Sequence, residues 1–275
     1  MPEPRAEKRY VHTRQGQLHC RSWTPSTQAR PPLLCLHAMP YSGLHFATLA
    51  PLLADRRQVI CPDYPGYGGS DALPGAPTIP IYAGAVLDMI AALELSGQVN
   101  VLGFHTGCLV AAEMALQSPT MIGRLVLIDV PLFEPEIRAQ RRSAVATPPG
   151  YDADPGSMAA AWEMNVSSKL DKLPIDRCME LLAEQLRTGT RAHEGFGAAF
   201  EYPADERLAS LRHDTLVIAT HSSLNGPSHA AADCLPNARL ENRTDLGPPV
   251  LDDGAPELAH LACRFLDRDA GQTDD

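Results

Sequence analysis

The stretch Gly103-Phe104-His105-Thr106-Gly107 decides the fold. It lies between the apolar run Val99–Gly103, which we expect as a buried strand, and Gly107–Gln117, which we expect as a helix. Glycine has no Cβ, so it adopts backbone conformations and close approaches that other residues avoid. A glycine on each side of His105 therefore predicts a sharp strand-to-helix turn with the histidine at its apex.

The segments on both sides repeat this alternation of strand and helix. After an expected hairpin, Tyr10–Gln15 with Gln17–Trp23, the expected strands are Leu33–His37, Gln58–Cys61, Val99–Gly103, Gly123–Val130, Thr215–Ala219 and Ala238–Asn242. The expected helices are Leu44–Leu53, Ile81–Leu95, Gly107–Gln117, Ser228–Cys234 and Pro256–Leu266. Such alternation predicts an α/β fold, a mostly parallel doubly wound sheet with helices on both faces.

Composition narrows the class of protein further. The 275 residues are 44% hydrophobic, and 23 Lys and Arg against 33 Asp and Glu give a net charge of −10. This rules out disorder over most of the chain and argues against nucleic acid or an anionic membrane as a partner. No run reaches the roughly 18 apolar residues of a membrane span.

The two remaining features concern the compartment. Residues Met1–Tyr10 are charged and precede no apolar segment, so we expect no signal peptide. The seven cysteines are scattered and include no Cys-x-x-Cys pair, which favours a reducing, cytoplasmic location and gives no support for structural zinc.

The alternation pauses between Pro131 and Arg207. We expect core segments 1–133 and 207–275, with residues 134–206 inserted as a helical cap. Short helices are expected at 158–166, 175–187 and 193–202, and the insertion concentrates Met, Trp and Phe. These side chains either pack only against one another or line a pocket beneath the cap.

Three further observations extend the pattern around His105. Leu36-His37-Ala38-Met39-Pro40 resembles a His-Gly-x-Pro loop, and Asp63-Tyr64-Pro65-Gly66-Tyr67-Gly68-Gly69-Ser70 resembles an Asp-x-Pro-Gly-x-Gly-x-Ser segment. The insertion follows the sixth expected strand. With Gly103–Gly107 as a nucleophile elbow, the chain resembles the α/β-hydrolase superfamily of the helical-cap type. The resemblance implies an oxyanion hole formed by the backbone N–H groups of Met39 and Thr106.

The chain departs from that family at all three positions of the catalytic triad. The elbow carries His105 where most members carry serine. The turn that usually supplies the acid reads Thr220-His221-Ser222-Ser223-Leu224-Asn225, without a carboxylate, and Leu246–Asp252 has no histidine where the family has its base. We therefore do not expect an ordinary serine hydrolase.

The candidate catalytic residues are His105, Asp129 and His221. A neutral imidazole offers a lone pair near pH 7, so His105 could act as nucleophile or general base, or could only line a binding pocket. Asp129 ends the sixth expected strand and could orient His105 or merely cap a turn. His221 could point at the pocket or lie on a surface loop.

Four other polar residues have weaker claims to chemistry. We expect His37 to hold its loop through hydrogen bonds and Asp63 to fix its glycine-rich turn. Cys108 should point into the packing between helix and sheet, and His193 should be a solvated residue at a helix end.

Three functions stay open. The chain could act on a small ester, thioester, lactone or related carbonyl compound with His105 at the nucleophile position. It could be a catalytically degenerate binding or accessory protein, or a cofactor-free lyase or isomerase with His105 as general base. No cofactor and no metal are expected, because no phosphate loop, dinucleotide fingerprint or metal-ligand spacing occurs. The expected partner is a small, largely apolar molecule; the sequence leaves its identity and the oligomeric state open.

Overall fold

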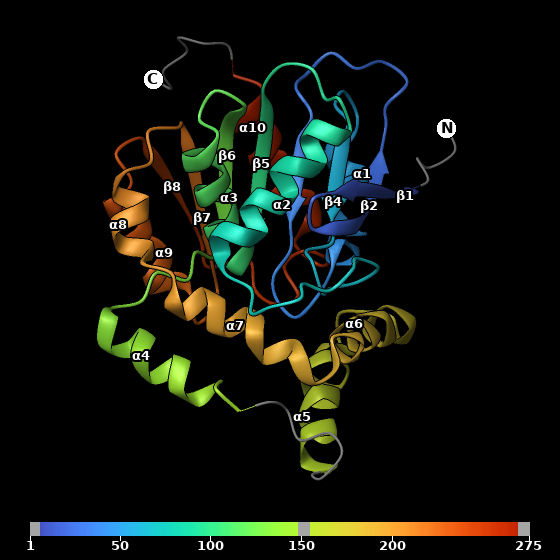
Figure 1. Cartoon of the computed structure of the whole chain (residues 1–275), viewed down its shortest axis with the longest axis vertical. Helices are drawn as coiled ribbons and strands as arrows, with labels where there is room; N and C mark the ends of the chain where they lie inside the picture. Colours follow the sequence, from blue (N-terminus) through green and yellow to red (C-terminus); the bar gives the residue numbers. More distant parts are fainter. Residues whose placement is uncertain (1–5, 148–154, 269–275) are drawn as a thin grey trace.

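The computed structural model describes residues 6–147 and 155–268, which form an eight-stranded sheet with the strand order β1-β2-β4-β3-β5-β6-β7-β8 (Figure 1). β1 and β2 form an antiparallel hairpin, β2 pairs antiparallel with β4, and all other neighbouring strands are parallel. The strands are β1 (Glu7–Thr13), β2 (Gly16–Trp23), β3 (Leu33–Leu36), β4 (Val59–Pro62), β5 (Val99–Phe104), β6 (Ile122–Ile128), β7 (Thr215–Thr220) and β8 (Ala238–Arg243). This is the mostly parallel α/β sheet that the sequence predicts.

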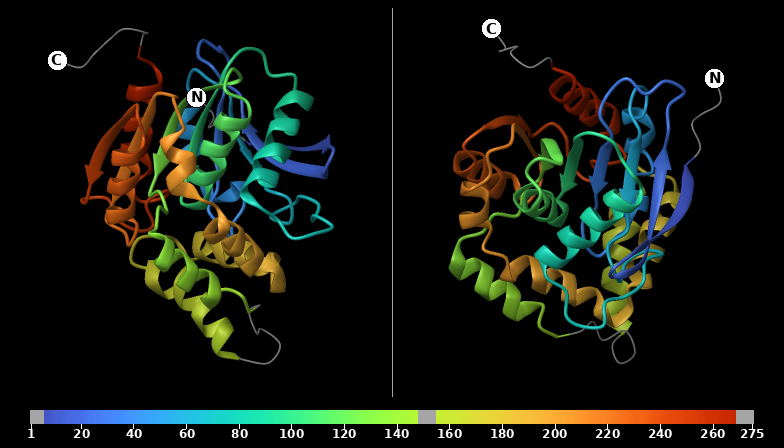
Figure 2. Two further views of the ribbon diagram at one scale, coloured as in Figure 1. Left: turned by 60° about the vertical axis from the view of Figure 1, so that its left-hand side comes forward. Right: turned by 45° about the horizontal axis from the view of Figure 1, so that its top comes forward.

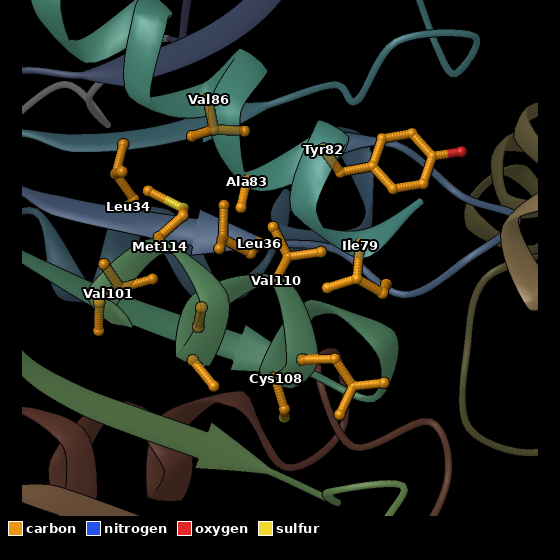
Figure 3. Close-up of a cluster of buried hydrophobic side chains, with 14 of the residues drawn as sticks. Leu34, Leu36, Ile79, Tyr82, Ala83, Val86, Val101, Cys108, Val110 and Met114 are labelled. Carbon is orange, nitrogen blue, oxygen red and sulfur yellow. The ribbon is translucent and has the colours of Figure 1, made fainter. Parts of the chain in front are cut away.

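Helices cover both faces of the sheet (Figure 2). One face packs against α2 (Ile79–Ala92) and α3 (Thr106–Gln117), and α8 (Ala204–Ala209) and α9 (Asn225–Cys234) contribute to the same core. Figure 3 shows this core, with Leu34 and Leu36 of β3 beside Val86 of α2 and Val110 of α3. The other face packs against α1 (Leu49–Leu53) and α10 (Ala255–Leu266).

Between β6 and β7 the chain forms a group of helices along one end of the sheet (Figure 1). The group, called the inserted helices below, comprises α4 (Pro135–Ala144), α5 (Pro155–Asn165), α6 (Ile175–Arg187) and α7 (Ala192–Glu201), with the 3₁₀ turns η2 (Ser167–Lys169) and η3 (Gly189–Arg191). Helices α5, α6 and α7 agree with the three short helices predicted from the sequence. Part of the loop expected between α4 and α5, residues 148–154, lies outside the described residues.

The charged stretch that contains α4 gave no sequence signal for a helix, because it has no apolar periodicity. It nevertheless forms one, with Pro135 in the first turn, where a missing N–H costs nothing. Glu136 in the first turn and Arg141 and Arg142 in the last complement the helix dipole.

The helix expected over Leu44–Leu53 is in fact two short elements. A 3₁₀ turn, η1 (Gly43–Phe46), is capped by the Ser42 hydroxyl, and α1 begins only at Leu49. Pro51 explains the break, since proline has no N–H to bond back along the helix and fits only within a first turn.

Among the described helices, none combines the length and the apolar character needed to cross a membrane.

The elbow glycines are required by close backbone contacts. A Cβ added to Gly107 would lie 2.0 Å from the carbonyl oxygen of Leu36, and one added to Gly103 would lie 2.6 Å from the carbonyl oxygen of Gly107. Both contacts are with backbone, which cannot swing away as a flexible side chain would. The start of α3 can therefore approach β3 only because these positions have no side chain.

We expect Gly107→Ala to lower the free energy of unfolding by more than about 2 kcal/mol, because the strand or the helix must shift. Urea unfolding followed by circular dichroism measures this. Gly197→Ala is the matched control, since its Cβ would have no atom within 4 Å in α7. That variant should be neutral or stabilised by up to about 1 kcal/mol. Equal stability of the two variants would contradict the close approach.

Candidate active site

His105 sits at the apex of the turn from β5 to α3, in a backbone conformation that L residues rarely adopt. Its φ is 50° and its ψ is −118°, and it is the N-cap residue of α3. Its N–H donates to the carbonyl oxygen of Ile128 in β6, at 3.0 Å, and its own carbonyl accepts from Cys108 N–H. Strained backbone of this kind persists only where the surroundings fix it, and such positions cluster at functional sites.

The structure brings Asp129 next to His105. Imidazole Nε2 lies 3.8 Å from Asp129 Oδ2, an ion-pair distance somewhat longer than a hydrogen bond. The imidazole is 38% exposed, whereas the carboxylate is 1% exposed. The histidine therefore faces open space while its carboxylate partner is shielded from water.

Asp129 is held in place from β7 as well. The Thr220 hydroxyl donates to Oδ2 at 2.6 Å, and the Thr220 N–H donates to Oδ1 at 2.9 Å. Burial by itself would raise the pKa of Asp129, but the proximity of His105 and the two bonds from Thr220 outweigh it, so the pKa is lowered. The carboxylate is thus ionised at neutral pH. Its bonds from Thr220 fix the turn at the end of β6, and its contact with His105 places a negative charge beside the imidazole.

Two cavities meet at His105. The larger has a volume of about 390 Å³. One part of its wall follows the carboxyl ends of β3, β5, β6 and β7 and includes Met39, His105, Asp129 and Ser222. The inserted helices form another part, with Met164, Leu181 and Phe196. The smaller, of about 180 Å³, lies between His105 and α4 and includes Thr106, Phe133, Arg141 and Phe200. Both cavities are mostly apolar.

The two backbone groups expected to form an oxyanion hole lie at the same place. Met39 follows β3 and lines the larger cavity, and Thr106 begins α3 beside His105 and lines the smaller one. Within the described part of the chain, neither N–H has a hydrogen-bond acceptor. Two unused donors beside a cavity can stabilise a developing oxyanion.

His37 holds the loop that carries Met39. Its Nδ1 donates to the carbonyl oxygen of Ala38 at 3.0 Å, and its Nε2 accepts from Tyr64 N–H at 3.2 Å. Burial lowers the pKa of His37 to about 4, so the ring is neutral and both nitrogens are used. The structural role predicted for His37 is confirmed.

The positions where hydrolases usually carry the acid and the base hold other groups. Ser222 and Ser223 line the larger cavity in the former acid turn, and Pro248 and Pro249 line it where the family places its histidine. His221 is exposed, and its N–H donates to the carbonyl oxygen of Leu246. His221 does not line either cavity. The structure therefore brings His105, Asp129, Met39 and Thr106 together and leaves His221 outside.

The structural roles predicted for Asp63 and Cys108 agree with their contacts. Asp63 accepts hydrogen bonds from Gly43 N–H and Gly69 N–H, both at 2.8 Å, which fixes the glycine-rich turn. The Cys108 thiol is fully buried and donates to the carbonyl oxygens of Gly103 and Ile128, and burial raises its pKa well above the usual value. A buried thiol with a raised pKa is a poor nucleophile.

His193 is half-buried near the start of α7 and bonds the carbonyl oxygen of Thr190 at 2.7 Å through Nδ1. It lines neither cavity.

Sequence reasoning missed His45, which lines the larger cavity. Its ring lies between those of Tyr41 and Phe104, with centroid distances of 4.4 and 5.4 Å, and its Nδ1 is buried without a partner. Burial lowers the pKa of His45 well below the usual value, so the ring is neutral. No sequence signal marks it, because the apolar spacing of its segment indicated only a helix.

The inserted helices are tied to the sheet across the larger cavity. Arg177 of α6 donates to Asp252 Oδ1 at 2.9 Å and to the carbonyl oxygen of His45 at 3.2 Å. The Tyr41 hydroxyl donates to Asn165 Oδ1 at the end of α5, at 2.7 Å. These partly buried bonds hold α5 and α6 over the cavity.

Comparison with known proteins bears on the fold of the chain. The family model described as "alpha/beta hydrolase fold" matches residues 31–158. The polyketide synthase ThaQ of Burkholderia thailandensis is 27% identical over 249 residues, and the human serine hydrolase-like protein is 29% identical over 120 residues. These matches cover 86% and 43% of this chain, but only 12% and 58% of the two relatives, so the chain spans less than two thirds of either.

Among solved structures, a thermophilic esterase from Thermogutta terrifontis superposes with a TM-score of 0.74 at 21% identity, covering 95% of this chain and 98% of the esterase. The chain has the α/β-hydrolase fold.

We expect Asp129→Asn to lower the free energy of unfolding by about 1–3 kcal/mol at pH 7, because the amide cannot accept both bonds from Thr220 and face His105 equally well. The folded-state pKa of Asp129 is lowered, so its stabilisation is complete above the unfolded value of about 4 and is lost as the pH falls further. The gap between wild type and variant should therefore narrow from pH 5 to pH 3.

Chemical unfolding at several pH values measures that gap. Asp233→Asn, at an exposed position of α9, serves as control and should differ little from wild type throughout. A gap for Asp129→Asn that stays constant down to pH 3 would show that the carboxylate charge is not what stabilises the site.

Proposed function

We propose that the chain is an enzyme that cleaves a small, largely apolar ester, thioester or lactone, with His105 at the nucleophile position and Asp129 as its orienting partner. The observation that carries the proposal is the pair itself: a half-exposed imidazole on the elbow, 3.8 Å from a buried carboxylate.

The pair supplies what a missing triad would otherwise provide. An Nε2–H directed at Asp129 fixes the tautomer and leaves the Nδ1 lone pair free, and the carboxylate stabilises the imidazolium that forms when Nδ1 takes up a proton. In an ordinary triad, one residue is the nucleophile and two others activate it. Here a base, His105, occupies the position of the triad's nucleophile. The attacking group must therefore be a bound water molecule.

The reaction proceeds with water as the nucleophile. Nδ1 of His105 takes a proton from water while the water oxygen bonds to the carbonyl carbon, and the N–H groups of Met39 and Thr106 stabilise the resulting oxyanion. When the carbonyl re-forms, the bond to the leaving oxygen or sulfur breaks and the imidazolium returns its proton to that atom. The products are the carboxylic acid and the alcohol or thiol.

The inserted helices act as a cap in this proposal, with residues 134–206 covering a core formed by 1–133 and 207–275. The apolar walls of both cavities favour a small and largely apolar substrate. The names of the serine hydrolase-like relative and of the esterase support ester cleavage as the reaction type. The cytoplasmic location stays a prediction from the sequence.

A second candidate is a binding or accessory protein that has kept the pocket and lost the reaction. Pro248 and Pro249 favour it, because they line the cavity where a hydrolase has its catalytic histidine and cannot transfer protons. A third possibility, proton abstraction next to a carbonyl by His105, uses the same base without adding water.

His105→Ala should lower kcat/KM for activated esters and thioesters by at least about 100-fold, because it removes the general base. His221→Ala is the matched control and should retain wild-type turnover, since that side chain lies outside both cavities. Initial rates on a panel of p-nitrophenyl esters, thioesters and lactones measure both. Wild-type rates in the His105→Ala protein would overturn the proposed role.

The same experiment separates the alternatives. Bound ligands recovered unchanged after long incubation, with no turnover in wild type, would indicate a binding protein. Deuterium uptake from solvent into a bound carbonyl compound, dependent on His105, would indicate proton abstraction in place of hydrolysis.

A further inference from the structure

The smaller cavity is lined by both His105 and a guanidinium, that of Arg141. Its walls are mainly apolar, with Leu109, Phe196 and Phe200 between His105 at one side and Arg141 of α4 at another. Among the described residues that line it, Arg141 is the one side chain that carries a permanent charge. A molecule filling this cavity would touch both the imidazole and the guanidinium.

Arg141 is held in place, but it is not neutralised. Its guanidinium lies 4.3 Å from the centroid of the Phe133 ring, which covers one face of the group. Its neighbours on the same helix are paired, Arg138 with Asp205 and Arg142 with Glu201. Within the described part of the chain, no carboxylate pairs with Arg141. The edge of the guanidinium, with its N–H donors, is therefore available to a ligand.

We propose that Arg141 binds a carboxylate on the substrate, so that the enzyme prefers acyl groups that end in a carboxylate a few carbon atoms from the reacting carbonyl. The inference rests on the proposed function and deepens it by naming the substrate class. A planar carboxylate matches the two parallel N–H donors at the edge of a guanidinium. One positive charge balances one negative charge, whereas a phosphate dianion would leave the cavity with excess charge.

The placement of the ends of the substrate follows from this geometry. The carbonyl lies beside His105 and the N–H groups of Met39 and Thr106, and the acyl chain runs between Phe196 and Phe200 toward Arg141. The leaving group then occupies the larger cavity. A neutral acyl chain of the same length would fit the walls but leave the guanidinium unpaired.

The kinetic test compares two isosteric substrates, the p-nitrophenyl hemiester of glutaric acid and the p-nitrophenyl ester of glutaric acid monoamide. Wild type should have a kcat/KM about tenfold or more higher for the carboxylate substrate, the expected effect of one charge-assisted bidentate contact at a partly exposed site. Arg141→Gln should abolish this preference, because it lowers kcat/KM for the carboxylate substrate about tenfold more than for the amide. Arg142→Gln, on the same helix but paired with Glu201, should keep it.

Absence of a preference in wild type, or an equal loss on both substrates in Arg141→Gln, would overturn the proposal. So would a loss of preference in Arg142→Gln equal to that in Arg141→Gln, since it would reflect only the general charge of α4.

A binding experiment separates this proposal from the proposed function. Glutaric acid monoamide, which carries a single carboxylate, should bind wild type in calorimetry and should bind Arg141→Gln at least about tenfold more weakly. If no ester is turned over but binding of the monoamide depends on Arg141, the proposed function fails and the carboxylate site stands. If esters are cleaved but binding of the monoamide is unaffected by Arg141→Gln, the carboxylate site is wrong and the hydrolase proposal survives.

Discussion

The site depends on the close approach of α3 to β3, which the elbow glycines allow. Because Gly107 lies against the backbone of Leu36, the N-terminal turn of α3 reaches the end of β3 with no side chain between them. His105 is then forced into positive φ, and its N–H is fixed by Ile128 of the next strand. This turn therefore fixes where His105 lies relative to the other residues of the site.

The same pattern continues along the sheet edge. Asp129 follows β6, also has a positive φ of 55°, and donates its N–H to the carbonyl oxygen of Ile218 in β7, while Thr220 at the end of β7 bonds the Asp129 carboxylate. Each strand end is therefore fixed by its neighbour, from β5 to β6 to β7. A buried carboxylate in this position is favourable only because it accepts these bonds and faces an imidazole.

Much of the fold could be predicted from the sequence, because each strand and helix of the sheet region carries a local signal. The runs around Leu34 and Val101 are short and apolar, and the glycines flanking His105 define the turn. The elements that were missed or misjudged lack such a signal: α4 is charged throughout, and the helix around Leu49 is limited by Pro51. Apolar periodicity predicts where most strands and helices occur. The prediction fails where a segment has no such periodicity, as in α4, or where a single residue such as Pro51 interrupts it.

The site was predictable only in part, because contacts between distant segments are not encoded in spacing. Asp129 could be named from its place at a strand end, but its bonds from Thr220, 91 positions further along the chain, could not. His45 and Arg141 reach the cavities from segments whose local sequences indicate only a helix or a charged surface. His221, by contrast, lies in the turn where the acid was expected and yet is exposed and lines neither cavity.

The proposed function requires that Asp129 sets the tautomer of His105 and so makes the elbow imidazole a base. Nitrogen-15 NMR of histidine-labelled protein at pH 8.5, where an ordinary imidazole is neutral, reports that tautomer directly. Signals assigned through the loss seen in His105→Ala should show a proton on Nε2 and a bare Nδ1, and Asp129→Asn should shift the population toward the other tautomer. A proton on Nδ1 in the wild type, unaffected by Asp129→Asn, would contradict the account.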